Sequence, residues 1–274
     1  PKGSYGGGSF FVQNLSKFLE NNNYKVVYEL QSNLDLIFII DPRKDSNNKY
    51  SLQEIIDYKK QYSNTKIIHR VNECDIKRDK SINIEPLLIR TMKEANIVIF
   101  VSKWLQDYFI KKYNLNLNHK YILNGCNSND FFPSQEKKFQ NNKIRLVTHH
   151  WSNNYLKGFH IYNEIDKILD NKKNLEFTYI GNYNPNYKPK NIKIISPKNG
   201  IELANIIKKH DIYITGTQNE PGAMHYLEGM SCGLPILYCK GGGGVQEICC
   251  IAGEEFHDIE TLLLKLDLIK TNYN

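Results

Sequence analysis

Two glutamates, Glu220 and Glu228, are separated by seven residues and give the strongest chemical signal in the sequence. The run before them, residues 211–215, predicts a strand, and the Pro-Gly pair directly after Glu220 prevents a regular helix there. From Ala223 onward apolar residues recur at helical spacing, which predicts a helix. One carboxylate is therefore expected in a turn and the other a little over one turn into a helix.

This arrangement has two interpretations. The free N–H groups at a helix start suit a phosphate, while a carboxylate in the turn can bond sugar hydroxyls and one in the helix can bond a ribose. Alternatively, the acidic residues simply complement the positive end of the helix dipole. The stretch taken alone supports both interpretations about equally.

The loop Gly6-Gly7-Gly8 precedes a predicted helix, and glycines there let the backbone approach a ligand closely. A dinucleotide fingerprint needs Gly-x-Gly-x-x-Gly, but Phe11 occupies the third glycine position. Glu29 lies near the distance expected of a ribose carboxylate, so a dinucleotide site stays open as an alternative. A P-loop is excluded, because no Gly-Lys-Ser/Thr follows. A tight turn without a ligand is the remaining interpretation.

Polar residues gather at the end of the predicted strand 66–71, where His69, Arg70, Asn72 and Asp75 fall within seven positions. Ligand sites of α/β proteins form at the carboxyl ends of parallel strands. A single histidine is usually structural, but this cluster favours a functional role.

The loop after residue 148 carries a histidine pair and a Lys-Gly pair. His149 and His150 suggest a metal, yet no third ligand stands at usable spacing and neighbours on an extended chain point apart. We therefore expect no metal site. Lys157 and Gly158, before a predicted helix, suit a phosphate, because a cation and free N–H groups would meet there.

Strands and helices alternate along the whole chain, which predicts parallel sheets with helices on both faces. The expected strands are 25–28, 34–40, 66–71, 97–101, 121–123, 144–148, 175–180, 192–195, 211–215 and 236–239. The expected helices are 9–20, 52–58, 85–95, 103–113, 159–169, 200–209, one from residue 223, one after residue 244, and 259–270. Residues 124–133 form a turn and linker, so we predict two Rossmann-like domains, 1–133 and 134–274, facing a central cleft.

Composition limits the possible partners. The 274 residues include 36 basic and 29 acidic side chains, for a net charge of +7. This spread-out excess suits a phosphate-bearing ligand or an anionic membrane surface, whereas nucleic-acid binders show a clustered patch. Six irregularly spaced cysteines without a C-x-x-C pair favour reduced thiols in a cytoplasm. No apolar run reaches transmembrane length and no signal peptide opens the chain. A strand is expected before Pro1 in the natural protein.

The stretch from Glu220 to Ile236 resembles the E-x7-E signature of retaining family 4 glycosyltransferases, roughly E-x-F-G-L-x-x-x-E-A-M-A-x-G-x-P-V. Ala223 stands where that pattern has Gly, and Gly229 where it has Ala. Further segments follow in the family's order, namely the loop of residues 6–8, a hinge-like segment at 124–133, Lys157-Gly158 and a Gly-rich loop at 241–247 that borders the nucleotide in the family. Taken without the resemblance, the last loop is a plain flexible turn.

The resemblance implies the GT-B fold and a hexosyltransferase-like enzyme. It would move a sugar from a nucleoside-diphosphate sugar to a hydroxyl of a glycan or a lipid-linked acceptor, with retention. Neither a metal nor a cofactor would be needed, and no nucleic acid is an expected partner. A cytoplasmic protein is implied, and its charge allows peripheral contact with the inner face of a membrane.

The resemblance also implies roles for individual residues. Glu220 would position the donor sugar and His69 would bond the transferred sugar. His150 or Ser152 would replace the arginine that usually accompanies the family's lysine. The donor-binding residues implied are Gly7, Gly8, His150, Ser152, Lys157, Gly222, Ala223, Met224, His225 and Glu228. The acceptor-side residues implied are Arg70, Asn72 and Asp75.

Two other functions remain as alternatives. One is a nucleotide-sugar epimerase or a dinucleotide oxidoreductase on a related fold, which dependence on nicotinamide would reveal. The other is a non-catalytic relative that binds sugars or partner proteins.

Overall fold

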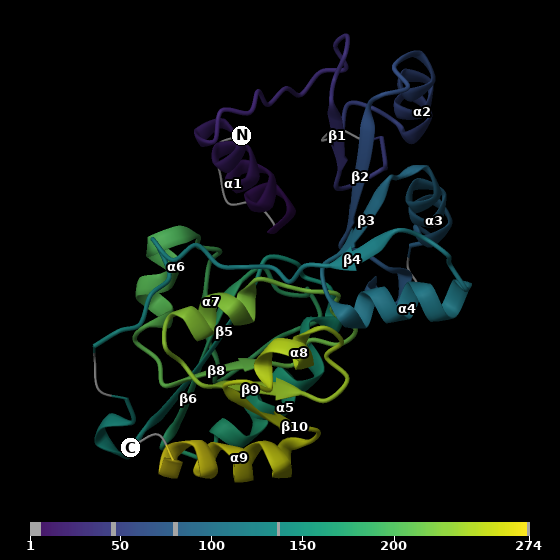
Figure 1. Ribbon diagram of the computed structural model, residues 1–274. Helices are drawn as coiled ribbons and strands as arrows, with labels where there is room; N and C mark the ends of the chain where they lie inside the picture. The colour runs from purple at the N-terminus through teal and green to yellow at the C-terminus, as the bar shows by residue number, and fades with distance from the viewer. Residues whose placement is uncertain (1–6, 45–47, 79–81, 136–137, 273–274) are drawn as a thin grey trace. The chain divides into compact units, whose positions relative to one another are not determined.

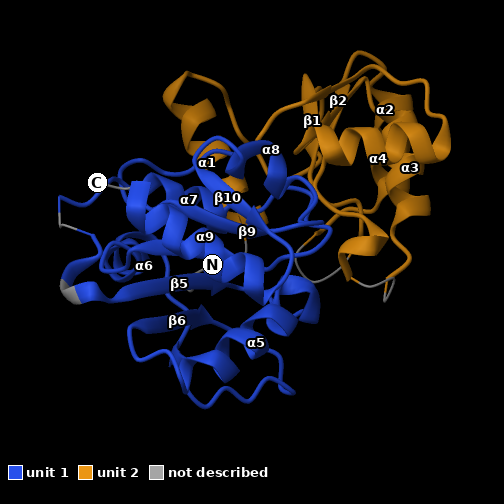
Figure 2. Cartoon of the chain, turned by 90° about the horizontal axis from the view of Figure 1, so that it is seen from below, with its two compact units in different colours: residues 1–6, 124–274 blue, residues 7–123 orange. Residues whose placement is uncertain are grey.

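The computed structural model describes residues 7–44, 48–78, 82–135 and 138–272. These residues form two compact units, 7–123 and 124–272, each with its own parallel sheet (Figure 2). The predicted domain boundary, after residue 133, lies inside the second unit. Gly6 and the predicted strand before Pro1 lie outside the described residues.

The first unit contains a four-stranded parallel sheet in the order β1-β2-β3-β4 (Figure 1). Its strands are β1 (Leu36–Ile39), β2 (Lys66–Val71), β3 (Ile97–Phe100) and β4 (His119–Tyr121). Its helices are α1 (Gly7–Asn21), α2 (Leu52–Gln61), α3 (Glu85–Glu94) and α4 (Lys103–Tyr113), with a 3₁₀ turn at Asp75–Arg78.

Local sequence signals explain where helices of this unit begin and end. Ser51 accepts a hydrogen bond from the backbone N–H of Glu54, whose side chain accepts one in return from Ser51, so a capping box starts α2. The side chain of Ser102 caps α4 in the same way. Asn114, in the left-handed conformation at φ 48°, ends α4.

The second unit contains a six-stranded parallel sheet in the order β7-β6-β5-β8-β9-β10. The strands are β5 (Ile144–His150), β6 (Leu175–Gly181), β7 (Lys193–Ile195), β8 (Ile212–Thr215), β9 (Ile236–Cys239) and β10 (Gly253–Phe256). The helices are α5 (Phe159–Leu169), α6 (Gly200–Ile207), α7 (His225–Ser231), α8 (Val245–Cys249) and α9 (Ile259–Asn272), with 3₁₀ turns at Gln140–Asn142 and Tyr155–Lys157. This is the strand order of a Rossmann domain, in which the order reverses between β5 and β8.

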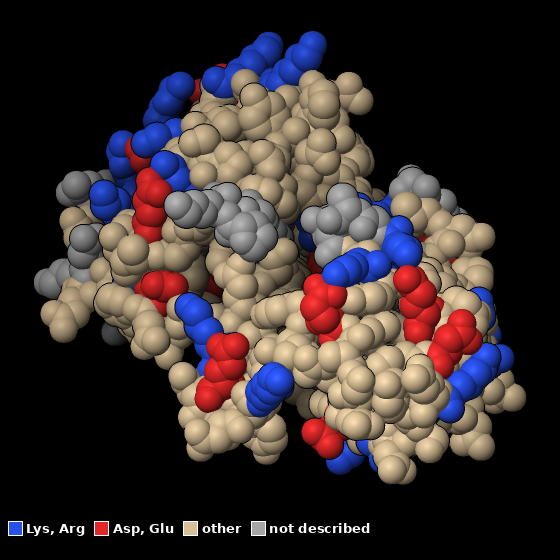
Figure 3. All heavy atoms as spheres, turned by 90° about the horizontal axis from the view of Figure 1, so that it is seen from above, with Lys and Arg blue, Asp and Glu red and all other residues tan. Residues whose placement is uncertain are grey.

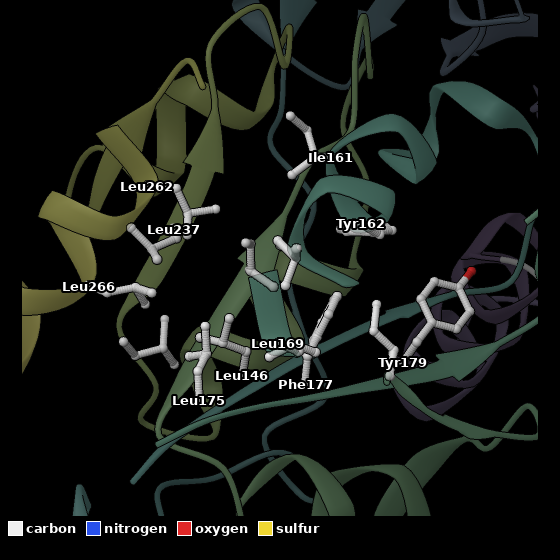
Figure 4. Close-up of a cluster of buried hydrophobic side chains, with 14 of the residues drawn as sticks. Leu146, Ile161, Tyr162, Leu169, Leu175, Phe177, Tyr179, Leu237, Leu262 and Leu266 are labelled. Atoms are coloured by element: carbon white, nitrogen blue, oxygen red, sulfur yellow. The ribbon is translucent and has the colours of Figure 1, made fainter. Parts of the chain in front are cut away.

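Helices cover both faces of this second sheet (Figure 1). Leu146 and Phe177 pack with Leu169 of α5 on one face, and Leu237 packs near Leu262 of α9 (Figure 4). The opposite face is covered by α6, α7 and α8. Because side chains alternate along a strand, odd and even positions of β5 and β8 belong to different faces.

The predicted α/β fold with two parallel sheets is therefore confirmed, with local corrections. The strand predicted at 25–28 is wrong, because these residues have no ladder partner and adopt irregular backbone. The strand predicted at 121–123 lies at His119–Tyr121 instead. α7 begins at His225, not Ala223, since the Pro-Gly pair keeps the preceding residues out of the helix. β10 was not predicted, because Gly253, Glu254 and Glu255 gave no apolar strand pattern.

Two surface properties bear on possible partners. Lys and Arg side chains lie beside Asp and Glu side chains at several places on the face that Figure 3 shows. Among the described residues, no helix is both long enough and apolar enough to cross a membrane.

Candidate functional site

The candidate site lies at the carboxyl ends of β5 and β8, the point where the strand order reverses. The two strands pair in parallel, with Leu146 opposite Ile212. Parallel pairing puts both carboxyl ends at one edge of the sheet, so the loops that follow the strands also meet there. This edge is where open α/β sheets bind ligands.

An ion pair joins these two loops. The ammonium of Lys157, on the 3₁₀ turn after β5, contacts carboxylate oxygen Oε2 of Glu220, in the loop after β8. Their side chains are only 12% and 4% exposed. Removing either partner would take away a direct ionic contact of a nearly buried charge. The two side chains that the sequence predicts at the diphosphate and at the donor sugar therefore contact each other.

Glycines make this approach of the loops possible. Gly158, directly after the lysine, has φ 104°, and a Cβ atom there would lie 2.7 Å from the Cα of Gly216. A side chain at either position would push the start of α5 away from the end of β8. The Lys-Gly pair thus supplies a charge and a close backbone contact at the same point.

The Gly-rich loop at residues 241–244 braces Glu220. The N–H of Glu220 donates to the carbonyl of Gly242 at 3.1 Å, and the N–H of Gly244 donates to the carbonyl of Glu220 at 2.8 Å. Gly243 lies between them at φ 76°, and a Cβ there would stand 2.7 Å from the Glu220 carbonyl oxygen. This loop is a fixed support for the glutamate and not a plain flexible turn.

Glu228 has a different partner, His149, which the sequence did not predict as a site residue. Glu228 lies in the first turn of α7, and its Oε2 is 2.6 Å from Nε2 of His149 at the end of β5. The hydroxyl of Tyr213, on β8, lies 3.0 Å from Nδ1 of the same ring. Alternation along β5 could have shown that His149 faces α7, because Val147 lies on that face.

His150 points to the opposite face, toward α5. Its Nε2 is 2.8 Å from the hydroxyl of Tyr162, which also accepts from the N–H of Gly216 at 3.2 Å, while its Nδ1 is buried without a hydrogen-bond partner among the described residues. The ring centre of His225 is 4.6 Å away. Burial, and then Lys157 and the neighbouring histidines, hold the pKa of His150 and of His225 well below the usual range. Both rings are therefore neutral at pH 7.

The remaining predicted donor-side residues have structural contacts. The hydroxyl of Ser152 accepts from the N–H of Asn154 at 3.2 Å, which forms a turn. The carbonyl of Gly222 accepts from the side chain of Asn124 at 2.6 Å. Ala223 and Met224 precede α7. No side chain caps the start of this helix, and the helix is only seven residues long. Lys157 is therefore a stronger positive group here than the short helix.

The first unit holds the other predicted residues. His69 is fully buried on β2, neither ring nitrogen has a hydrogen-bond partner among the described residues, and burial lowers its pKa to about 3. The guanidinium of Arg70 lies over the Phe11 ring, 3.9 Å from its centre, and burial lowers its pKa to about 10. Gly7 and Gly8 are the first residues of α1.

The two predicted acceptor-side residues after β2, Asn72 and Asp75, have different surroundings. The carboxylate of Asp75 accepts from the N–H of Ile84 at 2.7 Å, so it fastens the segment before α3. The side chain of Asn72 is half-buried. No group of three or more His, Cys, Asp or Glu residues within the described part of the chain could hold a metal ion.

Comparisons with known proteins identify the fold. The sequence matches no protein-family model and no curated protein. Among solved structures, WaaG, a glycosyltransferase involved in lipopolysaccharide biosynthesis, has a TM-score of 0.68 and 13% identity, covering 99% of this chain and 89% of its own. Sucrose-phosphate synthase from Thermosynechococcus elongatus has a TM-score of 0.65 and 14% identity, covering 96% and 68%.

A third structure contains a nucleotide sugar. Anabaena HepE in complex with UDP-glucose has a TM-score of 0.62 and 18% identity, covering 88% of this chain and 69% of its own. At these identities the similarity establishes the fold, which is the GT-B type with two Rossmann-like domains.

Proposed function

We propose that this protein is a glycosyltransferase that moves a sugar from a nucleoside-diphosphate sugar to a hydroxyl acceptor. The observation that carries the proposal is the nearly buried pair of Lys157 and Glu220 at the reversal point of the second sheet. One group suits a diphosphate and the other suits sugar hydroxyls, and a nucleoside-diphosphate sugar contains both next to each other. The structural neighbours WaaG and HepE give independent support.

The charges fit the reaction. Sugar transfer breaks the bond between the anomeric carbon and a diphosphate oxygen and forms a bond from that carbon to the acceptor oxygen, whose proton passes to the diphosphate or to water. Negative charge grows on the leaving diphosphate, where Lys157 stabilises it. Positive charge grows on the sugar ring, where the carboxylate of Glu220 shields it. In the free protein Lys157 and Glu220 neutralise each other. Donor binding replaces their ion pair with one contact from Lys157 to the diphosphate and one from Glu220 to the sugar.

Other residues complete the donor site in this proposal. Glu228 bonds the ribose, and the start of α1 at Gly7 and Gly8 lines the phosphates. His150, whose ring is neutral, takes the place of the family's usual arginine, and its Nδ1 has no hydrogen-bond partner among the described residues. His69, also neutral, bonds the transferred sugar and does not act as an acid.

We further propose the finer assignments that the sequence suggests. They are membership of family 4, retention at the anomeric carbon and transfer without a metal. The acceptor is a glycan or a lipid-linked hydroxyl, with Arg70 and Asn72 on its side. Asp75 also belongs to the acceptor side in this proposal, and its carboxylate accepts from the backbone N–H of Ile84.

A binding experiment tests the donor assignment. Thermal shift with UDP, GDP, ADP and NADH compares the wild type with Lys157→Met, since a ligand that binds only the native state raises its stability. We expect one nucleoside diphosphate to raise the melting temperature of the wild type and to lose most of this effect in Lys157→Met. Lys167→Met, from an exposed ion pair with Glu164 on α5, is the matched control and should keep the shift. A shift with NADH alone would instead favour the oxidoreductase.

A further inference from the structure

We infer that His149 and Tyr213 are positioning residues that hold Glu228 in one orientation toward the ribose of the donor. The inference rests on the proposed function, because it assumes that Glu228 meets a nucleotide. Sequence resemblance assigns no role to either residue, and they lie 64 positions apart in the chain.

The alternation of side chains along two strands brings the three residues together. His149 is the penultimate residue of β5, Tyr213 lies within β8, and both face α7, which carries Glu228. The phenol of Tyr213 is fully buried, and its ring meets the imidazole edge to face, with centres 5.6 Å apart and planes at 82°. The imidazole is therefore held on two sides, by packing and by hydrogen bonds.

Hydrogen-bonding groups at both ring nitrogens orient the imidazole. The backbone N–H of His149 donates to the Tyr213 hydroxyl oxygen at 3.1 Å, and this hydroxyl lies 3.0 Å from Nδ1 and 3.5 Å from the carbonyl oxygen of His149. Because a carboxylate only accepts hydrogen bonds, the Nε2 that faces Glu228 carries a proton. Nε2 then donates to Oε2 of Glu228 at 2.6 Å, the length of a strong charge-assisted bond.

The hydrogen bond from His149 occupies one carboxylate oxygen of Glu228 and leaves the other for a ligand. Among the described residues, Oε1 of Glu228 has no hydrogen-bond partner, and the side chain is 17% exposed. A carboxylate held through one oxygen presents the other in a fixed direction, which reduces the rotamer freedom lost on binding. Oε1 would accept from a ribose hydroxyl. The hydrogen bonds from Tyr213 through His149 to Glu228 would therefore determine how strongly the site distinguishes ribose from deoxyribose.

A departure from the family pattern accompanies this arrangement. The resembled signature has alanine where this chain has Gly229, and a Cβ atom there would stand 2.5 Å from the Tyr213 ring. An alanine would therefore displace the tyrosine that holds His149. Glycine at this position makes room for the phenol.

Calorimetric titration tests the inference through a ratio of two affinities. UDP, GDP and ADP are each compared with their 2′-deoxy forms, and we expect the wild type to bind the ribose form of its preferred nucleotide about tenfold more tightly. In His149→Leu the ratio should fall to about twofold, because the carboxylate of Glu228 is no longer held in one orientation toward the ribose. His149→Gln keeps a donor near Nε2 and should restore most of the ratio. Tyr213→Phe should give an intermediate ratio.

The outcomes separate the inference from the function. A purely structural role of His149 would weaken both nucleotides by the same factor and leave the ratio unchanged, which overturns the inference while the proposed function stands. A ratio near one in the wild type would overturn the assignment of Glu228 to the ribose and the inference with it. Failure of all three nucleoside diphosphates to bind the wild type would overturn both. His257→Gln, on an exposed residue outside the site, is the control and should keep the wild-type ratio.

Discussion

The ammonium of Lys157 and the carboxylate of Glu220 form a nearly buried ion pair across the two loops that follow β5 and β8. The residues are 63 positions apart in the sequence, and the Rossmann strand order makes them neighbours. A charge pair of this kind is balanced in the free protein and becomes available to a ligand that supplies both an anion and hydroxyl groups.

The first prediction concerns the stability of this pair. Lys157→Met and Glu220→Gln should each lower the free energy of unfolding by about 3 kcal/mol, because each removes one partner of a nearly buried ion pair. The double variant should lose less than the sum of the two, because the two side chains contact each other directly and their shared contact is lost only once. Urea denaturation of the three variants measures this coupling. Strictly additive losses would show that the two side chains do not interact in solution.

A second prediction concerns Gly229. Gly229→Ala should destabilise the protein by about 1–3 kcal/mol, because the new Cβ collides with the buried Tyr213 ring. Gly125→Ala is the matched control, since a Cβ at that position meets nothing within 4 Å. Melting temperatures of the two variants make the comparison. Equal stability of the two would contradict the tight packing of α7 on β8.

Gly8 permits a separation of folding from function. It lies in the first turn of α1, and a Cβ there meets nothing within 4 Å. Because alanine is a better helix former than glycine, Gly8→Ala should stabilise the fold by up to about 1 kcal/mol. If the loop lines the donor phosphates, the same change should weaken nucleoside-diphosphate binding. Thermal denaturation and calorimetry of one sample give both values, and unchanged affinity would remove this glycine from the donor site.

A fourth prediction follows from four histidines whose pKa is lowered by desolvation, His69, His150, His210 and His225. Burial lowers the pKa of each, to about 3 for His69 and about 4 for His210. Below the unfolded value of 6.5 the unfolded chain binds protons that the native fold does not, so stability must fall as the pH falls.

The expected loss is about 1 kcal/mol per histidine for each pH unit below that value. Denaturation at about pH 7 and pH 5.5 measures it. His150→Gln should reduce the slope, whereas His257→Gln, on an exposed residue, should not. Identical slopes in the wild type and His150→Gln would mean that His150 titrates normally in the fold.

The alternating pattern of strands and helices predicted most of the fold, while the roles of Lys157 and Glu220 came from their spacing together with the family resemblance. Phe159–Leu169 and Ile236–Cys239 have the bounds that the sequence predicted, because apolar periodicity and local start signals agree there. The strand Gly253–Phe256 could not be predicted, because glycine and glutamate have low strand propensity. These residues form a strand because they pair with β9.

The sequence pointed to charged residues such as Lys157 and Glu220 but not to the residues that contact them. The sequence suggested His149 only as a metal ligand, an interpretation that was set aside. Its role depends on contacts with Tyr213 and Glu228, which come close to it only in the folded sheet. The Gly-rich loop at 241–244 read equally well as a flexible turn, and only its pairing with the backbone of Glu220 shows its supporting role. Long-range contacts of this kind leave no local pattern in a sequence.

The central claim is that Glu220 acts on a donor sugar beside a diphosphate held by Lys157. Its most direct test measures the release of nucleoside diphosphate from UDP-, GDP- and ADP-sugars by the wild type and by Glu220→Gln, with nucleotide affinity determined on the same preparations. We predict that the wild type turns over one donor, and that Glu220→Gln still binds the corresponding nucleoside diphosphate but loses turnover by at least about a hundredfold. Turnover in Glu220→Gln equal to that of the wild type would contradict the account.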